Sequence, residues 1–347
     1  MARKVRLSII GFGVVGQGLA ELLLTQHDLL KQRYDMEIAL VGVATGRHGF
    51  IYRESGLDIA TLLTLAAQKR PLTEHPDVAR WPNALEGLRA TGGDILAEVT
   101  GTNLRDGEPG MQHIRAALQH GMHVVTANKG PIALAGRELM ALAQSRGLQL
   151  RAESTVMAGT PVMSTLLEGL AGTRVRAVRG ILNGTTNYIL SAMSEGRDYV
   201  EVLAEAQAKG YAEADPTADV EGYDAAAKAL ILAALVFDRS LSLDQIARRG
   251  ISAITGEEVE RAQEEGKRIK LITSLRLVGD GKDASLEARV EPVALPLHDP
   301  LARVDGVTNA ITCTTDAPGD VTVIGPGAGG LQTGQGLLAD IIAIASR

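Results

Sequence analysis

A single lysine interrupts the most apolar stretch of this sequence. Residues 224–237 read DAAAKALILAALVF, and this run of Ala, Leu, Ile and Val predicts a helix that is apolar nearly all round. Lys228 is therefore expected to be buried, and a buried ammonium needs a partner. Asp224 lies four residues earlier, on the same helical face. A buried lysine that is hydrogen-bonded to a carboxylate can pass protons to and from a substrate oxygen.

Further carboxylates precede this helix. They are Glu213, Asp215, Asp219 and Glu221. A structural ion pair, or a lysine whose ammonium reaches the surface along a buried stem, would produce the same pattern. On these residues alone the structural interpretation is favoured, so a catalytic site needs support from the rest of the chain.

The N-terminus carries a glycine-rich turn between a strand and a helix. The apolar strand 5–10 is followed by Gly11-Phe12-Gly13-Val14-Val15-Gly16, and residues 17–24 have a helical pattern. In this context the first glycine permits a tight turn, the second lets the backbone approach a pyrophosphate, and the third lets helix and strand pack closely. The helix N-terminus faces the phosphates. The pattern predicts dinucleotide binding; the alternative is an ordinary turn with chance glycines.

The end of the second predicted strand, 37–44, indicates which dinucleotide is bound. An acid at this position would bind the ribose 2′-hydroxyl of NAD. Here the strand runs into Thr45-Gly46-Arg47, which has no carboxylate. The guanidinium of Arg47 is suited to a 2′-phosphate, so NADP is favoured over NAD. The alternative is that Arg47 is a solvated loop residue.

The first half of the chain alternates strands with helices. Apolar strands at 94–100, 123–126 and 148–153 enclose helices at 111–120 and 132–146, which predicts an α/β, doubly wound parallel sheet. Thr100 and Lys129 follow the carboxyl ends of two strands, where such sheets bind ligands.

Beyond residue 150 the alternation stops. Strands are predicted at 175–182, 269–278 and 286–292, with a turn at 279–283, so a second, α+β domain is expected over 151–317. Residues 321–330 are predicted as a strand and a glycine-rich loop. Together with helix 332–344 they are expected to return to the first domain, which would comprise 1–150 and about 318–347. The segment NGTTN at 183–187 begins a helix, where free N–H groups suit a substrate carboxylate or serve only as a cap.

Composition excludes several classes of protein. The 347 residues are 45% hydrophobic and 22% charged with net charge −6, and no basic run suggests a nucleic-acid partner. Only 3% are aromatic, so base stacking is not expected either. No stretch is predicted to span a membrane. The single cysteine, Cys313, excludes an internal disulfide and fits a reducing, cytoplasmic compartment.

Seven segments in this order resemble homoserine dehydrogenase. They are IIGFGVVG, EVTGTN with DGEPG, VVTANKGP, AESTVMAGTP, ILNGTTNYIL, GYAEADPTADVEGYDAAAKALILA and GPGAGGLQTG. The resemblance implies a Rossmann-type nucleotide-binding domain and a second domain for substrate binding and dimerisation. It also implies interconversion of L-homoserine and L-aspartate 4-semialdehyde with NAD(P), on the route to threonine, methionine and isoleucine.

The resemblance assigns roles to individual residues. Lys228 is similar to the family's general acid/base, Asp224 orients it, and Lys129 lies near nicotinamide and substrate. Residues implied to border the substrate are Glu213, which holds the ammonium, with Gly210, Tyr211, Asp219, Gly184 and Thr185. Implied cofactor contacts are Phe12, Val14, Val15, Thr100, Lys129 and Gly327, beside the glycines Gly11, Gly13 and Gly16. A sodium ion is implied at Glu153, Val156, Ala158 and Thr160, mostly on backbone carbonyls.

The chain departs from many family members in one respect. It stops at Arg347, without the regulatory domain of roughly a hundred residues that the resemblance would add, and no kinase domain precedes it. We therefore expect a short monofunctional enzyme without the usual threonine inhibition.

Two other functions are compatible with parts of this sequence. Aspartate-semialdehyde dehydrogenase needs a thiol nucleophile, and Cys313 in ITCTTD has the character of a small buried residue. A dinucleotide-sensing protein would keep the fold without turnover. The Lys228–Asp224 pair argues against the sensor, which needs no proton relay.

Overall fold

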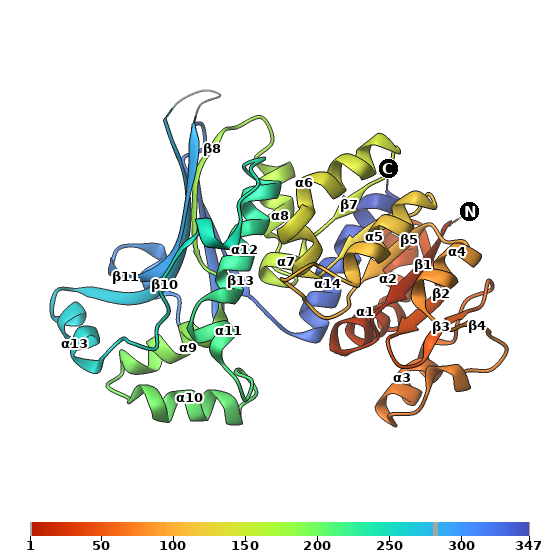
Figure 1. The fold of residues 1–347 in the computed structure, drawn as a ribbon, viewed down its shortest axis with the longest axis horizontal. Coiled ribbons are helices and arrows are strands. Elements are labelled where there is room, and N and C mark those ends of the chain that lie inside the picture. Colours follow the sequence, from red (N-terminus) through yellow and green to blue (C-terminus); the bar gives the residue numbers. More distant parts are fainter. Residues whose placement is uncertain (1, 280–283, 347) are drawn as a thin grey trace. The chain divides into compact units, whose positions relative to one another are not determined.

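The computed structural model describes residues 2–279 and 284–346 (Figure 1). The chain divides into two compact units. Unit 1 comprises Met1–Gly159 and Ala328–Arg347, and unit 2 comprises Thr160–Gly327. Each unit is built around its own sheet.

Unit 1 contains a seven-stranded sheet in the order β4-β3-β2-β1-β5-β6-β7. The strands are β1 (Arg3–Ile10), β2 (Met36–Thr45), β3 (Gly49–Tyr52), β4 (Ala79–Trp81), β5 (Ile95–Glu98), β6 (His123–Thr126) and β7 (Leu150–Arg151). Strand β1 pairs in parallel with both β2 and β5, and β6 and β7 continue the parallel part. Winding therefore reverses at β1, which is the point where such sheets bind a dinucleotide. The predicted doubly wound sheet is confirmed.

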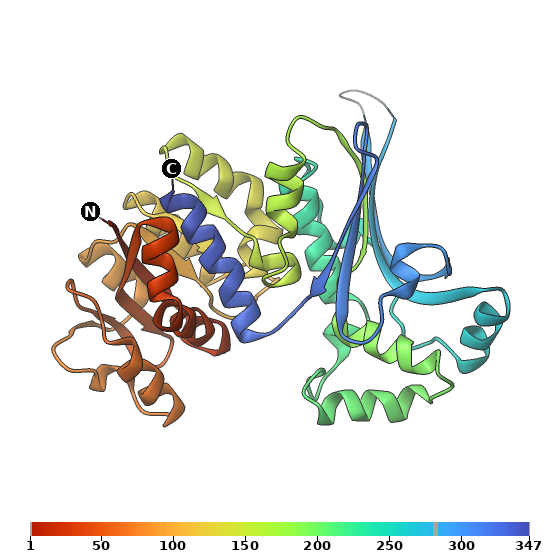
Figure 2. The same cartoon turned by 180° about the vertical axis from the view of Figure 1, so that it is seen from behind.

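Helices pack against this sheet. They are α1 (Val14–Thr25), α2 (His27–Tyr34), α3 (Ile59–Ala67), η1 (Leu72–Glu74), α4 (Ala84–Ala90), α5 (Gly110–Gln119), α6 (Lys129–Ser145), α7 (Ser154–Met157) and the C-terminal α14 (Gly330–Ala345). Helix α14 lies beside α1 although the two are far apart in sequence (Figure 2). Glycines permit this contact, because a Cβ at Gly18 would lie 2.4 Å from the carbonyl oxygen of Gly330.

Unit 2 contains a six-stranded sheet in the order β13-β12-β8-β10-β11-β9. The strands are β8 (Val175–Ile181), β9 (Ala247–Arg248), β10 (Lys267–Val278), β11 (Ser285–Pro296), β12 (Thr308–Thr315) and β13 (Asp320–Pro326). Neighbours are antiparallel except β9 and β11. Residues 280–283 of the turn predicted between β10 and β11 lie outside the described residues.

The remaining elements of unit 2 are mostly helical. They are α8 (Val162–Ser164), the π-helical turn η2 (Thr165–Gly169), α9 (Gly184–Met193), α10 (Tyr199–Ala208), α11 (Thr217–Val220), α12 (Tyr223–Leu235), η3 (Leu243–Gln245), α13 (Gly256–Glu264) and η5 (Pro300–Arg303). Helix α12 packs on β10 and β11, and residues 225–234 of it are all buried. No helix of the described ranges is long and apolar enough to cross a membrane.

The C-terminal border between the units differs from the predicted one. Residues 318–327 were expected in the first domain, but β13 pairs along its length with β12 and so belongs to unit 2. The chain returns to unit 1 at Ala328, just before α14. Strand β12 was not predicted from the sequence, so the strand predicted at 321–324 had no predicted pairing partner in the second domain.

Candidate functional site

The glycine-rich turn meets the steric demands of a pyrophosphate-binding loop. Gly11 has φ +101°, and a Cβ there would lie 2.5 Å from the carbonyl oxygen of Val99. A Cβ at Gly16 would lie 2.1 Å from the oxygen of Gly11, so the helix packs directly on the turn. Gly13 has open space around its Cβ position. Val14, the first residue of α1, is 75% exposed and offers an apolar side chain beside that space.

The turn after β2 holds the residue predicted to select the cofactor. Strand β2 ends at Thr45, whose Oγ1 accepts a hydrogen bond of 3.0 Å from the N–H of His48. Arg47 is exposed within this turn, and residues 43–48 include no carboxylate. Within this turn, therefore, no carboxylate would repel a phosphate bound by the guanidinium.

Thr100 and Lys129 follow the ends of the neighbouring strands β5 and β6. Between them the fully buried carboxylate of Glu98 accepts hydrogen bonds from Thr100 Oγ1 and, at 3.0 Å, from Asn128 Nδ2. The Oδ1 of Asn128 accepts from Gly130 N at 3.1 Å and so caps α6, which begins at Lys129. His113 Nδ1 lies 3.4 Å from Glu98 Oε1. The buried acid therefore holds the segments that carry both predicted residues.

Glu98 and Asn128 were not among the site residues predicted from the sequence. The available signal was an acid inside the apolar strand DILAEVT, because a buried carboxylate requires donors. Asn128 was not singled out either, although Asn is a preferred helix N-cap.

In unit 2, Lys228 and Asp224 form the predicted pair on α12. Lys228 is only 6% exposed, and its Nζ lies 3.0 Å from Asp224 Oδ2. The same Nζ donates a hydrogen bond to the carbonyl oxygen of Leu182, the first residue after β8. The end of a sheet strand thus fixes the position of the buried ammonium.

Asn183, the residue after Leu182, contacts the acids of this pair. Its Nδ2 donates to Asp219 Oδ1 at 2.7 Å and to Asp224 Oδ2 at 3.2 Å. Its Oδ1 accepts from Thr186 N at 2.9 Å and caps α9. From the sequence, Asn183 is predicted only as part of a turn, because these contacts join segments that are far apart along the chain.

The other residues predicted to bind substrate differ in their burial and in their contacts. The Oγ1 of Thr185 donates to the carbonyl oxygen of Tyr211 at 2.6 Å, so these two residues are brought together. Asp219 is half-buried, and burial raises the pKa of its carboxyl. Glu213 is exposed, and its backbone carbonyl oxygen accepts a hydrogen bond of 3.0 Å from Gln207 Nε2. Gly210 forms the turn after α10 with φ +74°.

The residues predicted to bind sodium are buried but divided between the units. Glu153, Val156 and Ala158 belong to unit 1, and Thr160 is the first residue of unit 2. The N–H of Glu153 donates to Asp340 Oδ2 at 2.9 Å. Within the described residues, no three His, Cys, Asp or Glu side chains form a metal-binding group. A site built mostly from backbone carbonyl oxygens would not require such a group of side chains.

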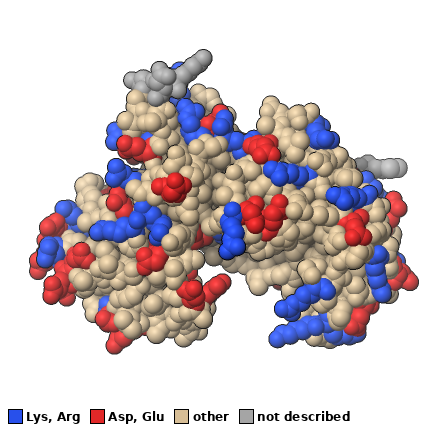
Figure 3. All heavy atoms as spheres, in the orientation of Figure 1, with Lys and Arg blue, Asp and Glu red and all other residues tan. Residues whose placement is uncertain are grey.

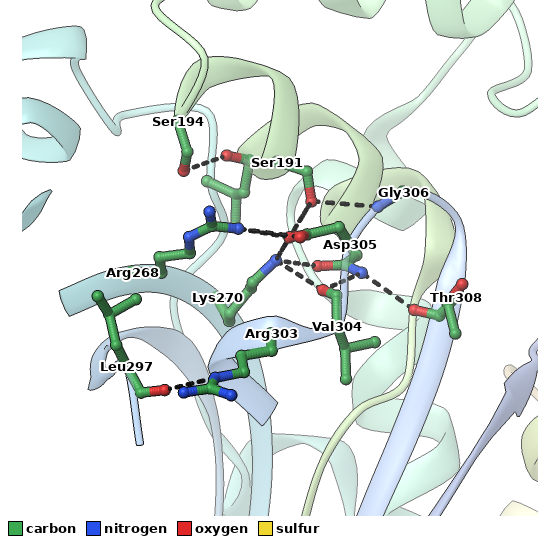
Figure 4. A network of polar contacts seen from close by, with 12 residues as sticks. Ser191, Ser194, Arg268, Lys270, Leu297, Arg303, Val304, Asp305, Gly306 and Thr308 are labelled. Atoms are coloured by element: carbon green, nitrogen blue, oxygen red, sulfur yellow. Dashed lines mark hydrogen bonds and ion pairs between the residues drawn. The ribbon is translucent and has the colours of Figure 1, made fainter. Parts of the chain in front are cut away.

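A second buried lysine, Lys270 on β10, was also missed. It is 1% exposed, and its Nζ donates to Asn187 Oδ1, Ser191 Oγ, Val304 O and Asp305 Oδ1 at 2.7–3.2 Å (Figure 4). Burial lowers the pKa of Lys270, and Asp305 opposes this shift. All three ammonium hydrogens have protein acceptors, so this lysine is an anchor between α9 and the sheet.

Charged side chains of both signs are interspersed over the face drawn in Figure 3. This mixture agrees with the modest net charge of −6. On this face, therefore, no extended area of positive charge is present that would guide a polyanion to it.

Comparison with known proteins decides the family. A profile described as "Homoserine dehydrogenase, NAD binding domain" matches residues 11–153, and one described as "Homoserine dehydrogenase" matches residues 161–342. The chain belongs to the homoserine dehydrogenase family. It is accordingly an NAD(P)-dependent oxidoreductase, and the family, fold class and enzyme class predicted from the sequence are confirmed.

Relatives in the homoserine dehydrogenase family cover nearly the whole chain. The "NAD(+)-dependent homoserine dehydrogenase" of Pseudomonas canavaninivorans is 42% identical over 98% of this chain and 96% of its own. The homoserine dehydrogenase of Methanocaldococcus jannaschii is 38% identical over 97% of each chain.

Solved structures of homoserine dehydrogenases have the same fold. The enzyme from Thiobacillus denitrificans has a TM-score of 0.84 and 34% identity, covering 99% of this chain and 74% of that one. A hyperthermophilic archaeal homoserine dehydrogenase in complex with NADPH has a TM-score of 0.82 and 30% identity, covering 99% and 98%. The predicted nicotinamide dinucleotide cofactor agrees with these relatives.

Proposed function

We propose that this chain interconverts L-homoserine and L-aspartate 4-semialdehyde with a nicotinamide dinucleotide, and that Lys228 is its general acid and base. The observation that carries the residue assignment is the buried pair on α12, in which Lys228 Nζ lies 3.0 Å from Asp224 Oδ2. Replacement of a buried ion pair by apolar residues is often stabilising, so stability alone does not account for it. A role in proton transfer would account for a buried lysine that is paired with a carboxylate.

In the oxidative direction the neutral amine of Lys228 takes the hydroxyl proton of homoserine as the aldehyde carbonyl forms. A bound nicotinamide would supply the redox chemistry, as the acceptor of the hydride that leaves the hydroxyl-bearing carbon of homoserine. In the reductive direction the Lys228 ammonium returns the proton to the aldehyde oxygen. Asp224 accepts a hydrogen bond from Nζ and fixes its direction.

The start of α9 and the segment before α12 are proposed to bind the substrate. The N–H groups at the start of α9 suit a carboxylate. The exposed carboxylate of Glu213 is suited to the substrate ammonium. The proposed substrate-binding residues are Gly184, Thr185, Gly210, Tyr211, Glu213 and Asp219.

Unit 1 is proposed to hold the cofactor at the carboxyl ends of its parallel strands. Lys129 is proposed to lie near the nicotinamide and the substrate. The proposed cofactor-binding residues are Gly11, Phe12, Gly13, Val14, Val15, Gly16, Arg47, Thr100, Lys129 and Gly327. The geometry of Gly11, Gly13 and Gly16 supports the pyrophosphate part of this assignment.

NADP is proposed as the preferred cofactor. Exposed Arg47, in a turn without carboxylates, supports recognition of a 2′-phosphate. Among the relatives, one is named NAD(+)-dependent and another is solved in complex with NADPH, so the names of the relatives do not indicate which cofactor this chain prefers. Arg47 is therefore the residue of this chain on which the proposed preference for NADP over NAD rests.

A sodium ion and a homodimer are the remaining parts of the proposal. Oxygen donors in the segment 153–160 suit a hard cation. Strand β13 is at one edge of its sheet and carries Ile324, which is 54% exposed, and an exposed apolar edge supports association with a second copy. A stability gain specific to sodium at constant ionic strength, and a solution mass twice that of the chain, would support these two assignments. We propose a cytoplasmic location, since the single cysteine fits a reducing compartment.

The deciding experiment is homoserine-dependent reduction of NADP and of NAD at alkaline pH, for wild type beside Lys228→Ala. Activity in wild type with kcat lower by roughly a hundredfold or more in the variant is expected for loss of a general base. Activity that survives in Lys228→Ala would remove this residue from the chemistry. Wild type that binds NADPH without turnover would favour a sensor instead.

A further inference from the structure

Asn183 donates hydrogen bonds from its side-chain amide to both acids beside Lys228, Asp219 and Asp224. It is 5% exposed, and its Nδ2 donates to Asp219 Oδ1 at 2.7 Å and to Asp224 Oδ2 at 3.2 Å. Both amide hydrogens are thus used on carboxylates. Hydrogen bonds to charged acceptors are the stronger class, so this contact has a larger effect than a neutral one.

The orientation of this amide is determined by the helix that follows it. Its Oδ1 accepts from Thr186 N at 2.9 Å, which is the N-cap bond of α9. An amide rotated by half a turn would place its NH2 against that N–H and its oxygen against two carboxylates. The cap therefore keeps the donor side of Asn183 toward Asp219 and Asp224.

Asn183 also lies next to the other contact of the ammonium. Leu182, its neighbour in the chain, accepts a hydrogen bond from Lys228 Nζ at its carbonyl oxygen. Two consecutive residues after β8 consequently contact the pair. Leu182 accepts from Lys228, and Asn183 donates to Asp224. A shift of this segment would move both.

We propose that Asn183 is a positioning residue for the proton transfer: by donating to Asp219 and Asp224 together, it keeps Asp224 aligned with Lys228. This inference rests on the proposed function. Without the bridge, two carboxylates in one partly buried cluster would repel each other, and Asp224 would be able to turn away from Nζ. Asp219, which is proposed to border the substrate, is joined to the proton relay by the same amide.

Two substitutions separate this role from helix capping. Asn183→Asp keeps the size and the capping oxygen but replaces the donor by a third acid among Asp219, Asp224 and Lys228. Asn183→Ser keeps a good N-cap but is too short to bridge the two carboxylates. The matched control is Asn83→Asp, because Asn83 caps α4 through Glu86 N at 2.9 Å and donates to Glu86 Oε1 at 2.6 Å.

The measurement is the pH profile of kcat for homoserine oxidation, with thermal unfolding as a check on folding. Added negative charge stabilises the Lys228 ammonium, so in Asn183→Asp the acidic limb of kcat should move up by about one pH unit. In Asn183→Ser, kcat should fall about tenfold, as expected for a lost bond to a charged group. Asn83→Asp should keep the wild-type profile.

An unshifted limb in Asn183→Asp, with kcat within twofold of wild type in both variants, would overturn the positioning role. If Asn183→Asp does not fold, the kcat of Asn183→Ser decides by the same criterion. Wild type without homoserine oxidation at any pH would instead overturn the proposed function, and the inference with it.

Discussion

Asn128 and Asn183 make the same pair of contacts in the two units. Each is almost fully buried and caps a helix with Oδ1, Asn128 through Gly130 N and Asn183 through Thr186 N. Each donates from Nδ2 to a carboxylate, Asn128 to Glu98 at 3.0 Å and Asn183 to Asp219 at 2.7 Å. In both cases the capped helix begins with residues of the candidate site.

Glu98→Gln should disturb this arrangement in unit 1. The carboxylate of Glu98 accepts from Asn128 Nδ2 and from Thr100 Oγ1. A glutamine NH2 would oppose at least one of these donors, so Thr100 and the cap of α6 should shift. We expect NADPH to bind about tenfold more weakly, as for a lost hydrogen bond to a charged group. Fluorescence titration of NADPH measures this.

Glu138→Gln is the control for Glu98→Gln. Glu138 is exposed and pairs with Arg115 at 2.9 Å on the surface, where ion pairs have small effects. Equal NADPH affinities for wild type, Glu98→Gln and Glu138→Gln would show that the buried acid does not organise the cofactor segment.

Lys270→Met should affect stability and leave the chemical step largely intact. Removal of the ammonium leaves the buried Oδ1 of Asn187 without its donor, whereas Val304 O still accepts from Asn187 Nδ2 and Ser191 Oγ from the N–H of Gly306. A loss of about 1–3 kcal/mol in the free energy of unfolding is expected from this unsatisfied amide oxygen. Urea denaturation followed by circular dichroism provides the value, and kcat should remain within a few-fold of wild type.

The control for that variant is Lys267→Met on the same strand. Lys267 lies toward the surface and pairs with Glu265 at 2.7 Å, so its loss should change stability by less than about 1 kcal/mol. Similar stability losses in both variants, or a kcat collapse in Lys270→Met, would contradict an anchoring role for Lys270.

Arg47→Ala should change cofactor preference. If the exposed guanidinium contacts a 2′-phosphate, the KM for NADP should rise by about tenfold or more while the KM for NAD changes little. Steady-state kinetics with each cofactor at saturating homoserine measures the two constants. Arg53→Ala, at another arginine of the same unit, serves as the comparison. An equal change in both constants for Arg47→Ala would refute the NADP assignment.

Asp340→Asn should reveal a pH-dependent contribution to stability. Burial raises the pKa of Asp340 from 3.8 to about 6, although Arg151 Nε lies 2.8 Å from its Oδ1. Between about pH 4 and pH 6 this carboxyl is therefore protonated in the folded chain and ionised in the unfolded chain. The stabilisation by the neutral carboxyl is complete below about pH 4 and is lost as the pH rises through about 6.

Relative to Asp340→Asn, wild type should lose up to about 3 kcal/mol of unfolding free energy across that window. Urea denaturation of both proteins at several pH values between 4 and 7 measures the difference. A difference that stays constant with pH, or that grows in favour of wild type, would show that the carboxyl is ionised throughout.

The sequence by itself determined those features that depend on neighbours within about one helical turn. Gly11, Gly13 and Gly16 are identifiable because each glycine is needed within a single strand–turn–helix unit. Lys228 and Asp224 are identifiable because helical periodicity alone brings residues four apart together. The motif order that implied the family is likewise a property of the chain.

Only the tertiary structure decided which distant groups meet those residues. Asn183 reaches Asp219 and Asp224 because β8 ends beside α11 and α12, and Glu98 reaches Asn128 because β5 and β6 are neighbours. The position of β13 depended on its pairing with β12, a strand that the sequence analysis did not predict. Such contacts are determined by strand order and register, which involve many residues at once and leave no periodic signal at the positions concerned.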